Sequence, residues 1–526
     1  MTDTTTIAST ETGAWSYSEP EAQGVSSEQI LAFLDAVEEF GSELHSLIIL
    51  RHGTVIARRW WHPYRPEAPH NLYSLSKTVT STAIGFAVNE GLLKVDDRVV
   101  DLLPDYDHST AGPYVEDLTV QHLLSMSIGH RGAMWEDRDR GDDWASAFFR
   151  IPIEDAPGTV FRYDSASSYL LSVIITKLTG QTVAEFLTPR LFDKLGFEGW
   201  IWDRCPAGLS LGSSGLSLRT DDIARLGQFY LDEGVWNGER LLPAEWIQAA
   251  TSAQVQQRPP WGPLELGAFP EIEKEPDPAR QLELLQQVSD YYQGYGYQIW
   301  LTRNNGYRAI GYTGQYCLVL PEHDMVIAIT SETEDTEDVL SEMIYAHLLP
   351  KPGAEALPAA PEAAERLRTR LTEGQLAGPV GAKTTATSEA ISGRTFALDP
   401  NPFDATGLTL TFGDDGAAFA LTVGEVEHVI HCGYEAWIDG GTRMPNTPPG
   451  MKPSDGRLPK VAAAGAWTSE NTYEMLWRFY EMPHHLRVTC TIDGDAITVE
   501  NAKSMHAFIP VAELFGEKEP VLTGTL

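Results

Sequence analysis

The chain has 526 residues, 42% of them hydrophobic and 10% aromatic, which excludes a disordered protein and allows two or three globular domains. Its formal net charge of −36 argues against nucleic acid and anionic membrane surfaces as partners. The four cysteines lie far apart and form no CxxC pair, so neither a disulfide framework nor a zinc site is expected: Cys205, Cys317, Cys432 and Cys490.

The first residues, MTDTTTIASTETGAW, have neither the basic start nor the apolar core of a signal peptide. No stretch approaches the roughly 18 apolar residues that a membrane span needs. We therefore expect a soluble, cytoplasmic protein.

The predicted elements run from strands through helices and back to strands. Residues 44–61 predict a hairpin with its turn at His52-Gly53. Helices are then expected over 71–91, 168–196 (broken at Gly180), 220–234 and 244–251. A Pro- and Glu-rich surface insertion follows over about 253–290, then strands over 294–330 and a last helix over 337–349. This order predicts an α/β (α+β) domain, in which helices flank an antiparallel sheet that joins both ends of the segment.

Composition divides the chain into three predicted parts. Residues 1–350 form the α/β domain, and 351–389, dominated by Ala, Pro, Glu and Thr, form a linker with one short helix. From 390 to 526, short alternating runs separated by Gly and Asp turns predict an antiparallel β-sandwich or barrel.

The stretch NLYSLSKTVTSTAIGFAVNEG, residues 71–91, raises the main chemical question. Ser74 and Lys77 stand three positions apart at the start of an apolar helical pattern, which puts a hydroxyl and an amine on one helix face. Taken alone, the simpler interpretation is that Ser74 caps the helix and Lys77 is solvated, because Ser-x-x-Lys occurs roughly once by chance in a chain of this length.

A second serine motif competes with the first. Residues 208–212, GLSLG, match the G-x-S-x-G nucleophile elbow around Ser210. That elbow requires a strand before the serine and a helix directly after it, whereas WDRCPA precedes it and the loop SSGLSLRT follows. We therefore expect Ser210 to be a turn residue.

Two further stretches carry groups that suit a site around Ser74. In PGTVFRYDSASSYLLSVI, Tyr163 stands on a loop that opens a helix, from which a phenol would reach a cleft. The alternative for Tyr163 is a half-buried core tyrosine. In AIGYTGQYCLVL, the small residues around Gly314 would let a strand pass close to a substrate.

Together these three stretches resemble the serine beta-lactamase and penicillin-binding-protein superfamily, especially its class C and esterase-like branch. Ser74 and Lys77 match its Ser-x-x-Lys motif, YDS at 163–165 its Tyr-x-Asn or Tyr-x-Ser motif, and YTG at 312–314 its Lys-Thr-Gly strand. The stretches LTVQHLLSMSIGH and GSSGLSLRTDDIARLGQFYLDEGVWNGERLLPAEWI are also similar to the family. The resemblance covers about residues 27–349 and does not reach the C-terminal β domain.

The resemblance implies a serine hydrolase that needs neither a cofactor nor a metal. Ser74 would attack a carbonyl and form an acyl-enzyme, with Lys77 and Tyr163 as a coupled base pair. Burial and mutual proximity are expected to lower the lysine pKa, and which of the two takes the serine proton stays open. Backbone N–H groups of Ser74 and Gln315 would form the oxyanion hole. Four residues would bind the substrate: Ser165, Tyr312, Thr313 and Gly314.

Two departures from the family narrow the substrate. Ser165 stands where beta-lactamases have asparagine, and Tyr312 stands where they have a lysine that binds the substrate carboxylate. Tyr-x-Ser is similar to the motif of 6-aminohexanoate-oligomer hydrolases and related carboxylesterases. We therefore expect a hydrolase of small-molecule esters or amides. Whether another cation, for instance Arg131 or Arg308, replaces the missing lysine stays open.

Two alternatives are kept beside this interpretation. The extra β domain favours a D-aminopeptidase or cell-wall-type peptidase, whereas a non-catalytic binding protein on the same fold would need the serine–lysine–tyrosine set to be broken. We treat His122 as structural, and the loop over 130–144 as either a solvated loop or a wall of the substrate site. The expected partner is a small-molecule substrate, with no nucleic acid and no membrane; a homo-oligomer stays open.

Overall fold

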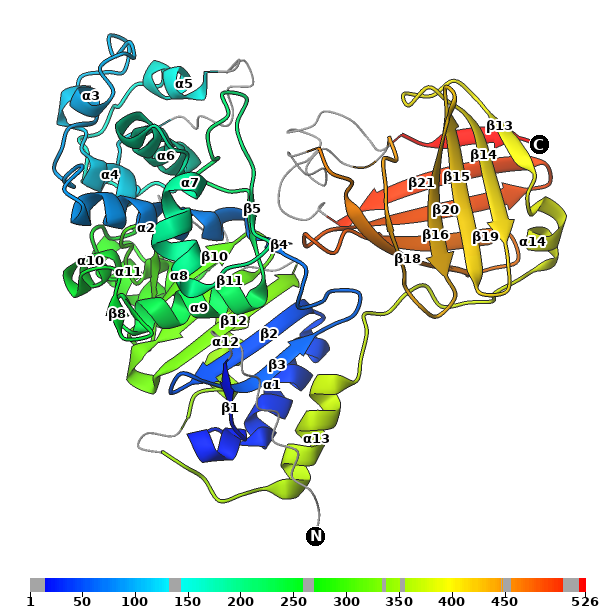
Figure 1. Cartoon of the computed structure of the whole chain (residues 1–526), viewed down its shortest axis with the longest axis horizontal. Coiled ribbons are helices and arrows are strands. Elements are labelled where there is room, and N and C mark those ends of the chain that lie inside the picture. Colours follow the sequence, from blue (N-terminus) through cyan, green and yellow to red (C-terminus); the bar gives the residue numbers. More distant parts are fainter. Residues whose placement is uncertain are drawn as a thin grey trace. The chain divides into compact units, whose positions relative to one another are not determined.

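The computed structural model describes residues 15–131, 143–258, 269–333, 337–350, 355–445, 447, 456–504 and 520–526. It divides into two compact units (Figure 1). The first unit comprises Met1–Arg59 and Leu72–Thr372, and the second comprises Trp60–Asn71 and Glu373–Leu526. A short segment from the N-terminal part of the chain therefore belongs to the C-terminal unit.

The first unit is built on a seven-stranded sheet. Its strands, in sheet order, are β1 (Ser16–Tyr17), β3 (Thr54–Trp60), β2 (Glu43–Arg51), β12 (Met325–Glu332), β11 (Gln315–Leu320), β10 (Gly306–Gly311) and β9 (Trp300–Thr302). The pairings from β2 through β9 are antiparallel, as the sequence predicts, and the edge pairing of β1 with β3 is parallel. The predicted turn between β2 and β3 is confirmed, because His52 and Gly53 both have positive φ angles, 51° and 66°.

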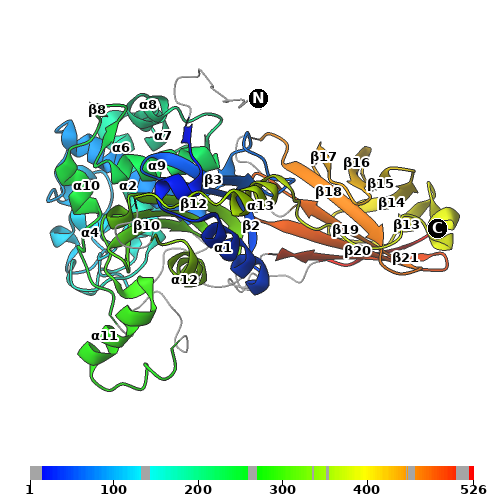
Figure 2. The ribbon, with the colours of Figure 1, turned by 90° about the horizontal axis from the view of Figure 1, so that it is seen from below.

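Helices cover both faces of this sheet (Figures 1 and 2). On one face lie α2 (Ser76–Asn89) and α9 (Thr220–Leu231), and on the other lie α1 (Ser27–Phe40) and α12 (Glu337–His347). The helix α13 (Pro361–Thr372), in the segment predicted as a linker, belongs to this unit. The remaining helices are α3 (Val99–Leu102), α4 (Val120–Leu124), α5 (Trp144–Arg150), α6 (Ser165–Thr179), α7 (Val183–Leu187), α8 (Asp193–Leu195), α10 (Ala244–Ala250) and α11 (Pro278–Val288). Two short antiparallel pairs complete the unit: β5 (Ile201–Trp202) with β6 (Leu216–Leu218), and β7 (Val235–Trp236) with β8 (Glu239–Arg240).

The helix α2 is buried on all sides from Ser76 to Ala87, although the sequence suggests only one apolar face. Two of its threonine hydroxyls find partners inside the protein: Thr78 donates to the carbonyl of Gln298 (2.7 Å) and Thr80 to the carbonyl of Gly212 (2.7 Å). Buried polar groups with such partners cost little and fix the helix in one position. The start of α2 is therefore rigidly held.

The second unit is a closed β-barrel. Nine strands follow one another around it in the order β16-β15-β14-β13-β22-β21-β20-β19-β18, and a parallel bridge between Gly433 of β16 and Ala464 of β18 closes the ring. The strands are β13 (Thr395–Leu398), β14 (Ala405–Phe412), β15 (Gly416–Val423), β16 (Val426–Gly433), β18 (Lys460–Trp467), β19 (Thr472–Arg478), β20 (His485–Asp493), β21 (Ala496–Lys503) and β22 (Leu522–Thr525). The unit also contains β4 (His70–Asn71), β17 (Ile438–Gly441), which pairs with β18, and α14 (Ala386–Ile391).

The barrel confirms one of the two all-β architectures predicted for the C-terminal region. Alternate residues of its strands point into a common apolar interior, which includes Phe396, Leu408, Trp477 and Val488. Alternation of apolar and polar residues is what a sheet with one buried face requires.

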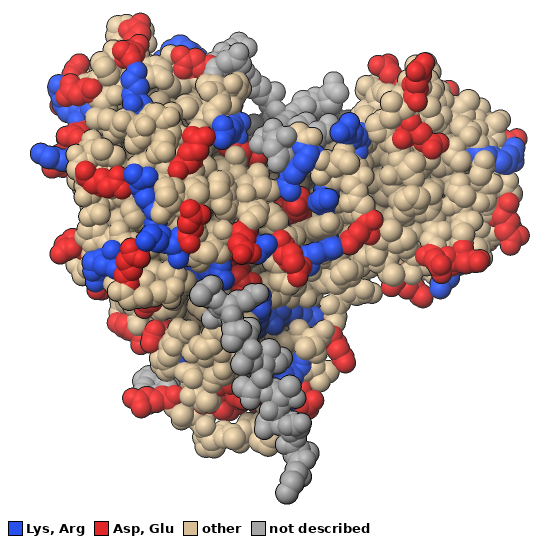
Figure 3. All heavy atoms as spheres, viewed as in Figure 1, with Lys and Arg blue, Asp and Glu red and all other residues tan. Residues whose placement is uncertain are grey.

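Charged side chains are mixed on the surface. Figure 3 shows acidic and basic side chains interspersed on the described part of one face. Many basic residues pair with nearby acids, such as Arg190 with Glu90 (2.6 Å) and Arg219 with Glu198 (2.6 Å). Such pairs match part of the acidic charge of the surface with nearby basic side chains.

Within the described residues, no single helix has both the length and the apolar character needed to cross a bilayer, and one bent pair, Ser165–Thr179 with Val183–Leu195, meets these criteria only when its two helices are taken together.

Candidate active site

Ser74 lies in the tight turn that leads into α2. A 3-10 turn, η2 (Tyr73–Leu75), precedes the helix, so Ser74 stands before the first residue of α2 rather than inside it. The turn is fixed by Ser76, whose hydroxyl donates to the carbonyl of Tyr73 (2.6 Å) and accepts from the N–H of Leu216 (3.1 Å). Tyr73 adopts a left-handed conformation with φ 46°, which is rare for an aromatic residue and typical of strained functional turns.

Lys77 is buried and contacts Ser74 directly. Its side chain is 2% exposed, and Nζ donates to Ser74 Oγ (2.8 Å) and to the backbone carbonyl of Ser213 (2.7 Å). Burial lowers the pKa of Lys77 to about 7, although the negative charge of Asp164 works in the opposite direction. The alternative that Lys77 is a solvated surface lysine is therefore wrong.

Tyr163 lies beside the Lys77 ammonium. The Lys77 nitrogen is 5.0 Å from the centre of the Tyr163 ring. Trp300 of β9 stacks on this ring with a centroid distance of 5.4 Å and an interplanar angle of 28°. Trp300 is itself packed by Tyr291 (4.9 Å) and Tyr295 (4.8 Å). The structure thus brings Ser74, Lys77 and Tyr163 together.

Asp164 and His130 form a buried pair next to this group. The Asp164 carboxylate caps α6 by accepting the N–H of Ala166 (2.8 Å), and its other oxygen lies 3.2 Å from Nδ1 of His130. Both side chains are less than a tenth exposed. Sequence reasoning missed this pair, although an aspartate just before a helix is a common capping signal. Ser165, the first residue of α6, follows directly and is half-buried.

The YTG residues form a turn, not part of a strand. Tyr312, Thr313 and Gly314 connect β10 to β11, and Gly311 lies opposite Gln315 across this turn. Thr313 and Gly314 have positive φ angles, 61° and 84°, which a strand would not allow. The prediction that residues 312–314 form part of a strand is therefore wrong. β10 ends at Gly311 and β11 begins at Gln315, so these three residues form the turn between the two strands.

This turn lies against the segment that leads to Ser74. A Cβ atom on Gly311 would come within 1.9 Å of the carbonyl oxygen of Leu72, so only glycine allows β10 to approach so closely. The side-chain amide of Gln315 donates to the carbonyls of Tyr312 (3.0 Å) and Ser331 (2.8 Å), which holds the turn in place. Gln315 is the first residue of β11.

Tyr312 carries a neutral phenol. Its ring packs edge-on against Tyr73 with centroids 5.6 Å apart. Burial, together with the nearby carboxylate of Glu332, raises the pKa of Tyr312 to about 12 and also raises the pKa of Tyr73. Tyr312 is therefore uncharged at neutral pH, and a negative charge lies near it.

The competing serine is structural. Ser210 is buried, its hydroxyl accepts the N–H of Ala184 (3.4 Å), and its carbonyl accepts the hydroxyl of Ser172 (2.7 Å). No helix follows it in the described residues before α9.

The structural role expected for His122 also agrees with its contacts: Nδ1 accepts the N–H of Thr119 (3.1 Å), which caps α4. Residues 132–142 of the loop considered as a substrate wall lie outside the described residues.

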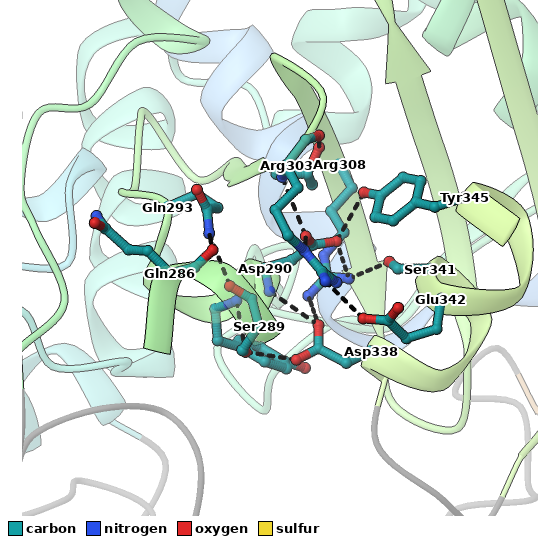
Figure 4. Close-up of polar contacts among 12 residues, drawn as sticks. Gln286, Ser289, Asp290, Gln293, Arg303, Arg308, Asp338, Ser341, Glu342 and Tyr345 are labelled. Atoms are coloured by element: carbon teal, nitrogen blue, oxygen red, sulfur yellow. Dashed lines mark hydrogen bonds and ion pairs between the residues drawn. The ribbon is translucent and has the colours of Figure 1, made fainter. Parts of the chain in front are cut away.

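Neither arginine considered as a replacement cation is suited to that role. Arg131 binds Asp155 through two hydrogen bonds (3.2 and 2.6 Å). Arg308 is fully buried and donates to the carboxylates of Asp290 and Asp338 (3.2 Å each), within the network drawn in Figure 4. Their charges are already matched by carboxylates.

Comparison with known proteins follows the same part of the chain. A protein-family model described as Beta-lactamase matches residues 44–349, more than half of the sequence. The 6-aminohexanoate-dimer hydrolase of Paenarthrobacter ureafaciens is 26% identical over 223 residues, 39% of this chain and 56% of that protein. Penicillin-binding protein 4 of Amycolatopsis lactamdurans is 28% identical over 252 residues, 41% of this chain and 62% of that protein. The matched part thus spans between half and two thirds of these relatives.

A solved structure of a penicillin-binding protein homologue from Caulobacter crescentus is similar with a TM-score of 0.46 and 17% identity, and the similarity covers 61% of this chain and 98% of that one.

Proposed function

Because the chain belongs to the beta-lactamase family, we propose that it is a serine hydrolase that cleaves ester or amide bonds of a small molecule through an acyl-enzyme on Ser74. One observation carries this proposal: a buried lysine amine lies 2.8 Å from the Ser74 hydroxyl, and its pKa is lowered to about 7. A serine hydroxyl needs a base within hydrogen-bond distance, and a base works best when its pKa is close to the working pH.

The first step is acylation. Ser74 Oγ attacks the substrate carbonyl carbon while its proton passes to the base pair of Lys77 and Tyr163. Roughly half of the Lys77 amines would be neutral near pH 7, because that is where its pKa lies. When the tetrahedral intermediate collapses, the bond to the leaving alcohol or amine breaks and the leaving group takes the proton. The two residues act as one coupled group.

The second step is hydrolysis of the acyl-enzyme. Water attacks the ester carbonyl, gives its proton to the same base pair, and Ser74 is released as a hydroxyl. We assign the oxyanion hole to the backbone N–H groups of Ser74, in the turn before α2, and Gln315, at the start of β11. The close approach of Gly311 to Leu72 supports this assignment, because it places the two segments side by side.

The proposed substrate has an uncharged group next to the cleaved bond. Tyr312 is a neutral phenol and Glu332 adds a negative charge near it, so a substrate carboxylate would be poorly received at this position. Ser165, Thr313 and Gly314 remain the proposed contacts for the rest of the substrate.

Labelling with a fluorophosphonate probe, followed by peptide mapping, tests the assignment of the nucleophile. We expect the label on Ser74 and its loss in Ser74→Ala, with hydrolysis of short p-nitrophenyl esters lost as well. Ser210→Ala is the matched control: Ser210 is buried in a β-bridge with Arg204, outside the Ser74 turn, so this variant should keep both labelling and hydrolysis. Label on Ser210 would contradict the proposal.

A turnover screen then distinguishes the proposed activity from its alternatives. The panel contains p-nitrophenyl esters, linear amides, D-aminoacyl amides and a chromogenic cephalosporin. We expect the esters or the linear amides to be cleaved fastest. Preference for D-aminoacyl amides would favour a D-aminopeptidase, and no turnover of any compound would favour a binding protein.

A further inference from the structure

A buried glutamine lies at the tip of a tight turn just before β9. Tyr295 and Trp300 form an antiparallel bridge, and Gln298 stands in the turn between them with only 2% of its surface exposed. Its φ angle of 59° is left-handed, which is unusual for a residue with a long side chain. Such a backbone persists only where the surrounding structure holds the residue in place, and it is frequent at functional sites.

The side-chain amide of Gln298 binds two helices at once. Its nitrogen donates to the carbonyls of Leu123 and Leu124, at the end of α4 (2.9 Å each). Its oxygen accepts the hydroxyl of Ser168, in the first turn of α6 (2.5 Å). Both amide hydrogens and the amide oxygen therefore have partners. The side chain thus fixes the end of α4 against the start of α6, and these two helices also pack on one another.

The backbone of Gln298 binds a third helix, α2. Its carbonyl accepts the hydroxyl of Thr78 (2.7 Å), and Thr78 directly follows Lys77 in this helix. Its N–H donates to the carbonyl of Leu124 (2.9 Å). The polar groups of this one residue are therefore bonded to α2, α4 and α6.

The same three helices hold both members of the proposed base pair. Lys77 is the second residue of α2, and Tyr163 lies two residues before α6. Met126, two residues beyond the end of α4, binds the backbone on both sides of Tyr163. The N–H of Arg162 donates to the Met126 carbonyl (2.8 Å), and the N–H of Asp164 donates to the Met126 sulfur (3.3 Å). The position of Tyr163 therefore depends on that of α4.

The turn also continues into the aromatic ring that packs on Tyr163. Trp300, two residues beyond Gln298, stacks on the Tyr163 ring with centroids 5.4 Å apart. The Lys77 nitrogen lies 5.0 Å from the centre of the same ring. Hydrogen bonds on one side of the turn and ring stacking on the other thus connect Gln298 to both residues of the base pair.

We propose that Gln298 is a positioning residue, which fixes Lys77 and Tyr163 relative to one another by holding the start of α2, the end of α4 and the start of α6 at one point. The inference rests on the roles proposed for Lys77 and Tyr163. Proton transfer from Ser74 depends steeply on the geometry of these groups, because a misplacement of about 1 Å can cost roughly a hundredfold in rate. Gln298 itself acts through the helices and not on the reacting atoms.

The variant Gln298→Gly in the full-length protein tests this inference. Glycine adopts a left-handed backbone without strain, so this variant keeps the turn and its backbone contacts while it removes the amide contacts with α4 and α6. We expect kcat for a p-nitrophenyl ester to fall by roughly ten- to a hundredfold, with KM changed by less than about twofold. The rate constant for fluorophosphonate labelling of Ser74 should fall to a similar extent.

The pH profile separates positioning from a mere loss of stability. The groups around the Lys77 amine are the Asp164 carboxylate, the Tyr163 ring, the Ser74 hydroxyl and the Ser213 carbonyl. Loosening of α2 against α6 would let water reach this amine, and a hydrated lysine has a higher pKa than a buried one. The rise of kcat/KM with pH should therefore move to higher pH in Gln298→Gly. A lower kcat with the rise at its wild-type pH would overturn the inference.

Gln257→Ala is the matched control. Gln257 is a fully buried glutamine of the same unit, and its amide oxygen accepts the N–H of Gly294 (2.9 Å), in the chain that leads to the turn. The substitution therefore removes a buried amide bound to the backbone ahead of the turn. We expect a wild-type kcat and a wild-type pH profile for this variant. Equal changes in Gln257→Ala and Gln298→Gly would overturn the inference, because they would report general weakening around the turn.

Two further outcomes keep this test separate from that of the proposed function. If wild-type protein is labelled at Ser74 and Gln298→Gly has the same kcat and pH profile, the positioning role is wrong while the nucleophile stands. If wild-type protein is not labelled at Ser74, the proposed function fails and the inference with it. Should Gln298→Gly not fold, Ser168→Ala removes one contact of the amide and should lower kcat several-fold with the same shift of the pH profile; an unchanged kcat would overturn the inference.

Discussion

Two cations are buried in the first unit, and their surroundings are opposite. Lys77 is 2% exposed and donates to a hydroxyl and a backbone carbonyl, both neutral. Arg308 is fully buried and donates to two carboxylates, Asp290 and Asp338. Burial lowers the pKa of Lys77 to about 7, whereas Tyr316 and the two carboxylates raise the pKa of Arg308 despite its burial. Burial alone therefore does not decide the charge of a group; its hydrogen-bond partners do.

The comparison assigns different tasks to the two sites. A cation matched by carboxylates stays charged and holds elements together: Arg308 of β10 binds Asp338 of α12 and Asp290, as Figure 4 illustrates. A lysine surrounded by neutral oxygens gives up its proton near neutral pH, which is what a catalytic base must do.

The largest expected effect comes from substituting Lys77, the buried cation with neutral partners, or its neighbour Tyr163. Lys77→Ala and Tyr163→Phe should each lower kcat by about 100- to 10,000-fold, and the double variant should be little worse, because the two residues act as one group. Lys77→Arg should be as inactive as Lys77→Ala, since an arginine keeps its proton. Steady-state kinetics with a p-nitrophenyl ester measures these losses; additive losses would mean that the residues do not share a proton.

Substitution of Arg308, the buried cation paired with carboxylates, should lower the free energy of unfolding. Arg308→Met leaves Asp290 and Asp338 buried without their cation, and loss of one partner of a buried ion pair costs about 3–5 kcal/mol of unfolding free energy. Urea unfolding measures this change. The triple variant with Asp290→Asn and Asp338→Asn removes the orphaned charges and should recover part of the loss. A triple variant less stable than Arg308→Met would show that the carboxylates have other essential partners.

A selectivity experiment tests the neutral character of the substrate site. Beta-lactams carry a carboxylate, and a missing charge-assisted hydrogen bond costs about 1.5–3 kcal/mol, or roughly ten- to more than a hundredfold in kcat/KM. We expect kcat/KM for a chromogenic cephalosporin to lie well below that for a short p-nitrophenyl ester. Tyr312→Lys should narrow this gap. Equal values in the wild-type protein would contradict the prediction.

The smallest expected effect concerns pH. In the proposed mechanism the neutral form of Lys77 is reactive, so kcat/KM should rise with pH through about 7. The charge of Asp164 raises the Lys77 pKa, so Asp164→Asn should move this rise to lower pH. Asp143→Asn is the control, because Asp143 is an exposed cap of α5. If kcat/KM of Asp164→Asn rises at the same pH as in the wild-type protein, the Asp164 carboxylate does not influence the pKa of the base.

The same pKa predicts a stability trend. Folding lowers the Lys77 pKa from 10.5 to about 7, so between these values the unfolded chain binds more protons than the folded one. The contribution of Lys77 to the free energy of unfolding should therefore increase as the pH rises from about 7 towards 10.5. Unfolding of Lys77→Met across this range is the reference, and it should lack this increase.

Local patterns in the sequence predict local structure well. Ser74 and Lys77 are three positions apart at a helix start, and a spacing of three places side chains on one face whatever the rest of the chain does. The hairpin turn at His52-Gly53 and the alternating strands of the barrel are local in the same sense. The barrel's closure by a single bridge from Gly433 to Ala464 is not, which explains why the sequence left a sandwich open.

The sequence did not predict three features, one of them built by residues far apart in the chain. His130 and Asp164 meet across 34 positions, and no spacing rule connects them. The turn over residues 312–314 was missed although it is local: Gly314 marks it with a φ of 84°, but Thr313, with a φ of 61°, is a residue type that seldom adopts a left-handed backbone. The helix α11 lies in the segment predicted as a surface insertion. Its capping signal is present in the sequence, because Asp277 accepts the N–H of Ala279 (3.0 Å).

The pairing of β2 with β12 has a consequence for how the protein is made. Arg51 lies opposite Met325, so more than half of the chain separates the two strands at the middle of the sheet. A ribosome adds about 5–20 residues per second, so β2, buried along almost its whole length in the finished sheet, waits for its partner for roughly a quarter of a minute to a minute. During that time its apolar residues are exposed to other nascent chains. We therefore expect yield in a cell to depend on chaperones that bind the N-terminal third during synthesis.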